Sequence, residues 1–322
     1  MRPMPLLRAD PWDPDFGMGF QAPVDEASAP RADPFVESPD WSTPLSPSDV
    51  PEPGELWFVD GVRRVDLRVL ADEGERRVPG LFGSFAVGSV RSNGRATFEE
   101  HRICRAIVLG GGVVPDEVQA RAGRDVFSFS PATEPGTDPD APLLRLQHLM
   151  REAENALAAH LTLGGAPLVV VDGPLRLGEE SGGRIVGVIK RFVRRYLEPE
   201  QEALLARLQA GQRTPVFALQ DQAGATRGYS WYARLRNIAG PWHDHAGIVR
   251  CEARAGLGLD AVVGIADLLT VTLPRFAGRA ADPRTPQNLA PIAALESWLR
   301  HRMGDRRIVR RALLTLLADE AA

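Results

Sequence analysis

The chain has 322 residues and 44% of them are hydrophobic, which is enough to fill the core of one large α/β domain or two smaller ones. It contains no run of about 18 apolar residues that could span a membrane, and residues 1–5 lack the apolar core of a signal peptide. We therefore expect a cytoplasmic protein with no membrane contact. The only cysteines, Cys104 and Cys251, lie far apart, which excludes a disulfide framework and a cysteine zinc site.

The net charge of −4 is unevenly distributed along the chain. Residues 1–55 carry eleven acidic and three basic side chains, a net charge of −8, so the remainder carries +4. A mildly basic body can bind phosphate groups even though the whole chain is acidic. Long-range attraction depends on where the charged residues cluster rather than on the net charge of the chain. The composition therefore does not exclude a nucleic acid as the partner.

Residues 1–53 hold twelve of the 27 prolines, and acidic and small residues separate their isolated aromatic side chains. Such a segment cannot form a helix or a sheet unaided, because proline lacks an amide donor. Two interpretations remain open: a disordered leader, or a strap that docks its aromatic residues on the domain or on a partner. We divide the chain into this leader and a globular body of residues 54–322.

The pattern of apolar residues predicts the elements of the body. Antiparallel strands are expected at 56–59, 65–69, 83–88 and 102–109, and a loop at 131–142 precedes an amphipathic helix over 143–162. Continuous apolar runs predict buried strands at 167–171 and 185–190. A helix over 198–210, three strands within 215–252 and helices over 259–276, 286–303 and 305–319 follow. This order is typical of an α/β fold with a mixed sheet flanked by helices and with additional C-terminal strands and helices.

Two segments share one local design, Val59-Asp60-Gly61 and Val171-Asp172-Gly173. In each, an apolar strand is expected to end in the aspartate, and the glycine lets a backbone or a ligand approach closely. Two such strands side by side would bring the carboxylates together, and converging carboxylates repel unless a divalent cation holds them. Oxygen ligands favour magnesium or manganese. A simple strand-end turn remains the alternative for either Asp-Gly pair taken alone.

A third acidic ligand is expected from the helix over 143–162. Glu154 is favoured, because it lies four residues after Met150 and three before Leu157, close to the apolar stripe. Glu152 is the alternative ligand. A solvated position, paired with Arg151 or Arg145, remains open for both glutamates.

Lys190 is the only lysine among the 38 lysine and arginine residues, and it ends a predicted buried strand. A chain that uses arginine for every other cation has kept a compact ammonium group at this position, where the planar fork of arginine would not serve. We therefore predict a catalytic or phosphate-contacting role for Lys190.

Several basic residues could follow a nucleic-acid backbone, and solvated helix faces explain them equally well: Arg191, Arg194, Arg195, Arg300, Arg302, Arg306, Arg307, Arg310 and Arg311. Trp231 and Tyr232 could stack on an unpaired base, and nearby Arg234 could contact DNA, although core aromatics are the more expected interpretation of an alternating strand. The glycines at 110–112 lack the Gly-Lys-Ser/Thr of a P-loop, so we do not expect the chain to hydrolyse ATP by itself.

The order of these motifs resembles the NurA nuclease family over residues 55–305. The motifs are the first Val-Asp-Gly, the helix glutamate, Val-Val-Asp-Gly-Pro-Leu, Val-Gly-Val-Ile-Lys and a late Asp282-Pro283-Arg284-x-Pro286-Gln287-Asn288-Leu289. The resemblance implies an RNase H-like core and a manganese- or magnesium-dependent DNA nuclease. Such enzymes cut single strands and digest DNA ends. They act as homodimers in resecting double-strand breaks, together with HerA, a hexameric DNA-translocating ATPase.

The resemblance also implies roles for individual residues. Asp60, Asp172 and the helix glutamate would be metal ligands and, with Lys190, the catalytic group. The late motif would complete the metal site or hold DNA through Asp282, Arg284 and Asn288. One departure from the family is Val62, where serine or threonine is common.

Two other functions remain open on the sequence alone. The first is a catalytically silent RNase H-like adaptor that couples a motor ATPase to DNA, although an adaptor would not need converging carboxylates. The second is a nuclease that acts chiefly on RNA, since no reader of the 2′-hydroxyl is recognisable in the sequence.

Overall fold

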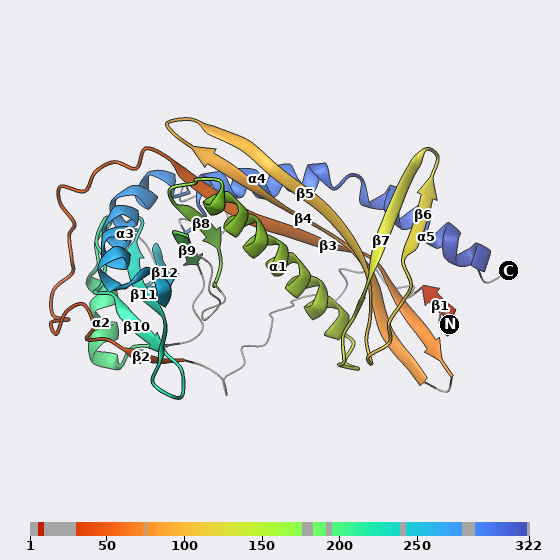
Figure 1. Cartoon of the computed structure of the whole chain (residues 1–322), viewed down its shortest axis with the longest axis horizontal. Coiled ribbons are helices and arrows are strands. Elements are labelled where there is room, and N and C mark those ends of the chain that lie inside the picture. Colours follow the sequence, from red (N-terminus) through yellow and green to blue (C-terminus); the bar gives the residue numbers. More distant parts are fainter. Residues whose placement is uncertain are drawn as a thin grey trace.

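The structure, a computed structural model, describes residues 6–9, 30–74, 76–175, 183–190, 195–238, 243–278 and 287–320. One large mixed sheet runs through the molecule, with helices on both of its faces (Figure 1). The predicted α/β class with a mixed, helix-flanked sheet is therefore confirmed.

Five strands form the centre of the sheet, in the order β9-β8-β3-β4-β5. The chain first builds an antiparallel meander of β3 (Leu56–Glu73), β4 (Arg76–Ser92) and β5 (Ala96–Leu109). Helix α1 (Ala141–Leu163) then returns the chain to two further strands, each parallel to its neighbour: β8 (Val169–Asp172) beside β3, and β9 (Ile185–Ile189) beside β8. An antiparallel meander, a helix and two strands that run parallel to the first form an RNase H-like core.

Further strands extend this core on both sides. Beyond β9 the sheet continues antiparallel through β12 (Ile248–Arg254), β11 (Thr226–Arg234), β10 (Phe217–Gln220) and β2 (Arg31–Asp33). Beyond β5 lie β7 (Asp125–Thr133) and β6 (Val118–Ala122), and the far end of β3 pairs with β1 (Leu6–Ala9).

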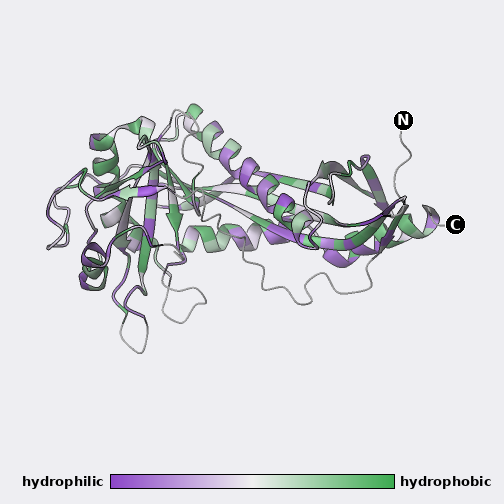
Figure 2. Ribbon diagram, turned by 90° about the horizontal axis from the view of Figure 1, so that it is seen from below, coloured by the Kyte–Doolittle hydropathy of each residue, from purple (hydrophilic) through white to green (hydrophobic). Residues whose placement is uncertain are grey.

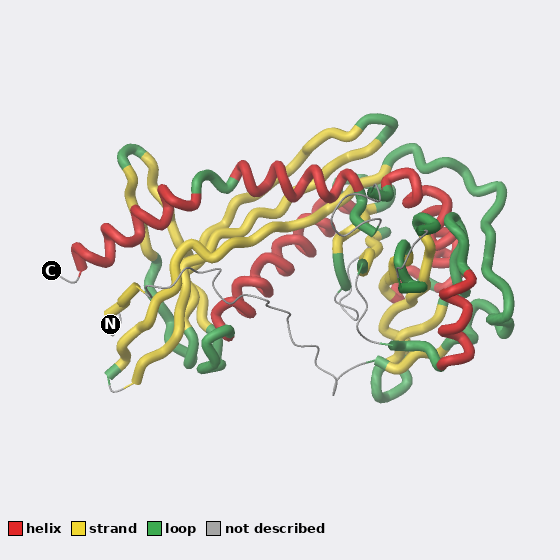
Figure 3. The backbone as a smooth tube through the Cα atoms, turned by 180° about the vertical axis from the view of Figure 1, so that it is seen from behind, coloured by secondary structure: helices red, strands yellow, loops and turns green. Residues whose placement is uncertain are grey.

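The helices bury different faces of the sheet. Helix α1 packs its apolar stripe, which includes Leu143, Leu146 and Met150, on one face of β3, β4 and β5. The opposite face is covered by α3 (Leu259–Thr272) and α4 (Ala290–Arg302), and α5 (Arg306–Glu320) continues from α4 along this side (Figure 3). Helix α2 (Pro199–Arg207) packs over β10 and β11. Helix α1 carries both hydrophilic and hydrophobic residues (Figure 2), and burial of its apolar stripe fixes which side of the helix faces the sheet.

Two parts of the meander differ from the sequence expectation. The strands expected at 56–59 and 65–69 are one strand, β3, because β4 pairs with it along its whole length, with one register shift between Val65 and Leu67. The hairpin of β6 and β7 was not predicted, and β7 extends into the expected loop at 131–142. The strand signal in this segment is the alternation of Phe127, Ser128, Phe129 and Ser130.

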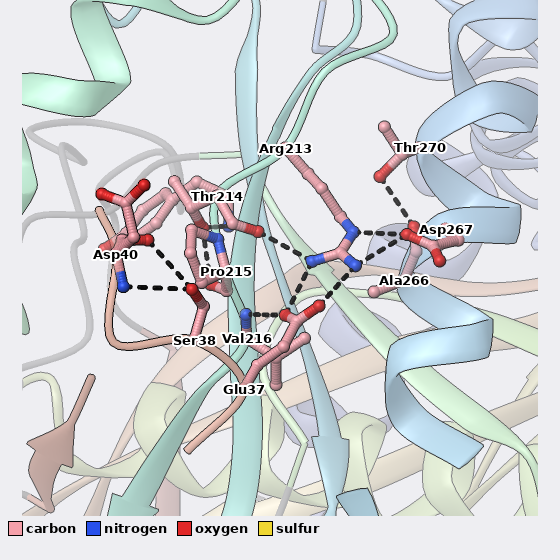
Figure 4. Close-up of polar contacts among 11 residues, drawn as sticks. Glu37, Ser38, Asp40, Arg213, Thr214, Pro215, Val216, Ala266, Asp267 and Thr270 are labelled. Carbon is pink, nitrogen blue, oxygen red and sulfur yellow. Dashed lines mark hydrogen bonds and ion pairs between the residues drawn. The ribbon is translucent and has the colours of Figure 1, made fainter. Parts of the chain in front are cut away.

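Residues 30–53 dock on the body of the protein through β2, an isolated bridge between Leu45 and Arg213, and an ion pair (Figure 4). The Glu37 carboxylate accepts hydrogen bonds from Arg213 Nη1 and Nη2 at 2.8 and 2.7 Å, and Arg213 also pairs with Asp267 of α3. Trp41 is 8% exposed and packs against Phe217. We call residues 30–53 the strap.

The described helices include none that is both long and apolar enough to cross a lipid bilayer.

Candidate metal centre

Three carboxylates meet beside the central strands of the sheet. The parallel register aligns Phe58 with Val170 and Val59 with Val171, so that Asp60 and Asp172 are the next residues in the same row. Glu296 of α4 joins them, and one carboxylate oxygen from each of the three residues lies within 4.8 Å of the other two. Asp60 lies inside β3 rather than at a strand end as expected, whereas Asp172 does end β8.

Glu154 approaches Asp60 from α1, on the face of the sheet opposite α4. A side chain at Gly61 would place its Cβ 2.6 Å from Glu154 Oε1 and 3.0 Å from Met150 Cγ. The glycine inside β3 therefore makes room for α1 rather than for a turn. Glu154 is 1% exposed, so the helix delivers this carboxylate into the interior beside the three others.

The cluster is short of positive charge. Burial, followed by the charges of Asp172 and Glu154, holds the pKa of Asp60 well above its usual range, although Lys190 acts in the opposite direction. Burial also raises the pKa of Glu154 to about 7, and Arg151 only partly offsets this effect. Each of these shifts reports a carboxylate whose charged form lacks compensation.

Two buried oxygens of the cluster, Asp60 Oδ2 and Glu154 Oε1, have no hydrogen-bond partner among the described residues. Buried polar atoms without a partner are costly, and hard oxygen donors of this kind are the ligands that magnesium and manganese prefer. The donor set therefore fits a divalent cation held by Asp60, Asp172 and Glu296, with Glu154 behind them.

Lys190 contacts this cluster through Asp172. Its Nζ donates hydrogen bonds to Asp172 Oδ2 at 2.7 Å and to Asn288 Oδ1 at 3.0 Å. Asn288 stands just before α4, so the only lysine of the chain connects the end of β9 to the helix that carries Glu296. The structure thus brings together five residues that the sequence singled out: Asp60, Glu154, Asp172, Lys190 and Asn288.

Arg151 ties α1 to the segment after β8. Its Nη1 donates hydrogen bonds to the Asp172 carbonyl oxygen at 2.6 Å and to Glu154 Oε2 at 3.0 Å. Gly173 has a φ of +108°, and a Cβ there would lie 2.7 Å from Arg151 Nη1. Glycine at this position therefore permits both the backbone conformation and the approach of the guanidinium group.

Sequence reasoning missed Glu296, although the signal that favoured Glu154 was also present in α4. Glu296 lies four residues after Ile292 and three before Leu299, both of which are buried. It is 9% exposed and paired with Arg300. A single sequence gives no indication of which of two similar helices brings its glutamate to the aspartates.

Other predicted site residues lie elsewhere. Glu152 points away from the cluster and pairs with Arg145. Tyr232 is 3% exposed in the core beside α2, and Arg234 donates hydrogen bonds to the carbonyl oxygens of Leu205, Asp244 and Ala246. Because both side chains face inward from β11, we correct the prediction that they contact DNA. Arg195 is exposed beside Glu202, and four predicted residues lie outside the described part of the chain: Arg191, Arg194, Asp282 and Arg284.

Fold and site together define an RNase H-like α/β protein with a candidate centre for a divalent cation. No protein-family model and no curated protein matches the chain. Among solved structures, human endonuclease V is 16% identical, with a TM-score of 0.28 over 78% of this chain and 84% of that chain. Endonuclease V of Ciona intestinalis, in complex with inosine-containing DNA, is 10% identical, with a TM-score of 0.31 over 77% and 85%. Similarity at this level says nothing about the function of the chain.

Proposed function

We propose that the protein is a divalent-metal-dependent nuclease. One observation carries this proposal: Asp60, Asp172 and Glu296 place carboxylate oxygens within 4.8 Å of one another, beside buried acceptors that no described residue satisfies. Asp172, Glu296 and Glu154 each have a basic partner, but Asp60 has no ion-pair partner among the described residues. Because unpaired buried charge is strongly destabilising, a purely structural cluster would not leave Asp60 in this state. A bound divalent cation would offset the repulsion between these carboxylates and so stabilise the folded protein.

Different residues of the cluster would have different roles in phosphodiester hydrolysis. Asp60, Asp172 and Glu296 would hold magnesium or manganese, and Glu154 would support Asp60 from the other face of the sheet. When bound, a divalent cation supplies positive charge for the phosphate and for an attacking water. Lys190, whose side chain is 11% exposed, is placed to offset negative charge on a phosphate oxygen.

We further propose that the substrate is DNA, which the enzyme cuts within single strands and digests from its ends. RNA is the alternative substrate, and a direct comparison of the two distinguishes them. The motif order that resembles NurA supports this choice. The same resemblance supports a homodimer that works with a HerA-type hexameric ATPase in resecting double-strand breaks. It agrees with a sequence that has no P-loop of its own.

The experiment is cleavage of end-labelled single-stranded and duplex DNA, and of RNA of the same sequence, with manganese, magnesium or a chelator. Wild type is compared with Asp60→Asn and Asp172→Asn, and with Glu152→Gln as a control on the outer face of α1. We expect metal-dependent cleavage that both aspartate variants lose and the control retains. Cleavage by a folded Asp60→Asn protein at the wild-type rate would refute the site. If wild type is inactive with every metal and also with the ATPase present, the silent adaptor is the better function.

A further inference from the structure

A stack of aromatic rings lies where β5 meets α4. The rings of Phe98 and Trp298 are parallel, with an interplanar angle of 1° and centroids 4.7 Å apart. His101 meets Trp298 edge-on at 4.8 Å. The Arg302 guanidinium lies 5.7 Å from the centroid of the Trp298 ring, and its Nε is 3.3 Å from His101 Nε2. We call Phe98, His101, Trp298 and Arg302 the aromatic platform.

The platform stands at an open edge of the sheet. Strand β7 pairs with β5 only from Ala106 to Leu109, so among the described strands residues 96–103 of β5 pair with β4 alone. Phe98 is 43% exposed although it stacks on Trp298, which leaves part of its ring accessible to a ligand. An exposed aromatic ring that is backed by a second ring and a cation offers a rigid, flat contact surface.

The platform and the acid cluster share helix α4, and their strands β5 and β3 both pair with β4. In the register of the sheet Asp60 stands opposite Gly88, and Gly88 stands opposite His101. Two strand spacings separate the ends of this row, which is about 10 Å. Helix α4 carries both Glu296 and Trp298. A Cβ on Gly88 would lie only 3.0 Å from Leu299, so the glycine lets α4 settle closely on the sheet between them.

The charges around the platform favour an anionic partner. Of the two acids on this part of β5, Glu99 pairs with Arg91 at 2.9 Å, and Glu100 lies 3.4 Å from the imidazole of His160. Arg302, Arg95 and Arg102 are all exposed at the same edge. A flat ring among cations suits an unpaired base on a negatively charged backbone, because every base has a face that can stack.

We propose that the aromatic platform binds an unpaired base of single-stranded DNA and so holds the strand beside the acid cluster. This inference rests on the proposed function, because it assigns that nuclease a preference for unpaired strands. Duplex DNA gains little from the platform, since its bases are already stacked on one another.

The test is the binding of a fluorescently labelled 20-nucleotide single strand and of a duplex of equal length to the full chain. Anisotropy is measured with chelator present, so that cleavage does not interfere. We expect Phe98→Ala to weaken single-strand binding about tenfold, within the range of a stacked base, and to change duplex binding less than about twofold. Phe98→Tyr restores the stack and the affinity. Phe35→Ala is the matched control, because Phe35 is 55% exposed on the strap at the opposite edge of the sheet.

Three results would overturn the proposal: wild-type affinity in Phe98→Ala, equal losses for single strand and duplex, or no binding of single strands by wild type at low salt. A change in sedimentation of Phe98→Ala without a change in DNA affinity would assign the edge to a second copy of the chain instead. Because the assay needs no catalysis, the nuclease function and the platform can fail separately. Loss of cleavage in Asp172→Asn says nothing about Phe98, and intact single-strand binding says nothing about hydrolysis.

Discussion

Lys190 Nζ lies 2.7 Å from Asp172 Oδ2, and this contact joins the only lysine of the chain to the aspartate that ends β8. The same Nζ reaches Asn288, next to the helix that carries Glu296. The ammonium group of Lys190 therefore connects three separate segments around the acid cluster. The arrangement also makes Lys190 the side chain whose replacement tests the site most directly.

Lys190→Arg is expected to lower the rate of DNA cleavage about 100-fold, and Lys190→Met at least as much. Arginine keeps the charge, but its planar fork does not reproduce a compact ammonium that donates to two oxygens about 3 Å away. Single-turnover rates in manganese measure the effect. A folded Lys190→Met variant that cleaves like wild type would show that this lysine is structural.

Glu296→Gln is expected to weaken manganese binding at least about tenfold, because it removes one of three converging carboxylate charges. Glu152→Gln is the matched control, since Glu152 is on the exposed side of α1 and pairs with Arg145. Isothermal titration of each variant with manganese gives the affinities. Equal affinities in wild type and Glu296→Gln would exclude Glu296 as a ligand.

Removal of metal is expected to destabilise the protein more as the pH rises. Burial raises the pKa of Glu154 to about 7 in the folded chain, whereas the ordinary value is 4.5. The folded state therefore binds more protons between these values, so the contribution of Glu154 to stability is complete below pH 4.5 and is lost as pH rises through about 7. The raised pKa of Asp60 acts with the same sign.

Thermal unfolding in chelator should accordingly give a lower Tm at pH 8 than at pH 6. Manganese should raise the Tm more at pH 8, because cations bind the deprotonated acids. In Glu154→Gln the pH dependence of the metal-free protein should shrink. A manganese-induced shift in Tm that is independent of pH would contradict this explanation.

Gly173→Ala and Arg151→Gln are expected to destabilise the protein by less together than the sum of their separate effects. Alanine at Gly173 meets both a φ of +108° and the Arg151 guanidinium, so the single change costs about 2 kcal/mol. In the double variant the shorter glutamine relieves the steric conflict, so only the backbone strain at position 173 remains. Urea unfolding of the four proteins in the cycle should give a coupling of about 1 kcal/mol. Strict additivity would mean that Arg151 does not occupy the space beside Gly173.

Glu37→Ala is expected to lower the free energy of unfolding by about 3 kcal/mol, because it leaves Arg213 buried with one acidic partner fewer. Glu52→Ala is the control on the same strap. Its ion pair with Arg275 is exposed, so the loss should stay below about 1 kcal/mol. Chemical denaturation measures both. Equal effects of the two changes would show that Glu37 does not anchor the strap.

Much of the fold could be predicted because its signals are local. The meander and the amphipathic α1 leave periodic patterns in the sequence, and the buried strands β8 and β9 leave continuous apolar runs. The order of these elements defines the core. The β6 and β7 hairpin was missed although its residues alternate. Asp60 was misplaced at a strand end, because nothing in the sequence near Gly61 shows that β4 pairs along the whole of β3.

The sequence by itself determined which chemistry is available: two aspartates in apolar strands, each followed by glycine, and a single lysine after a third strand. Tertiary structure decided which other groups join them. Glu154 and Glu296 occupy equivalent positions on their helices, yet they reach Asp60 from opposite faces of the sheet, and Tyr232 and Arg234 turn into the core instead. The physical reason is that periodicity fixes which face of an element is buried, whereas only the packing of distant elements fixes what that face meets.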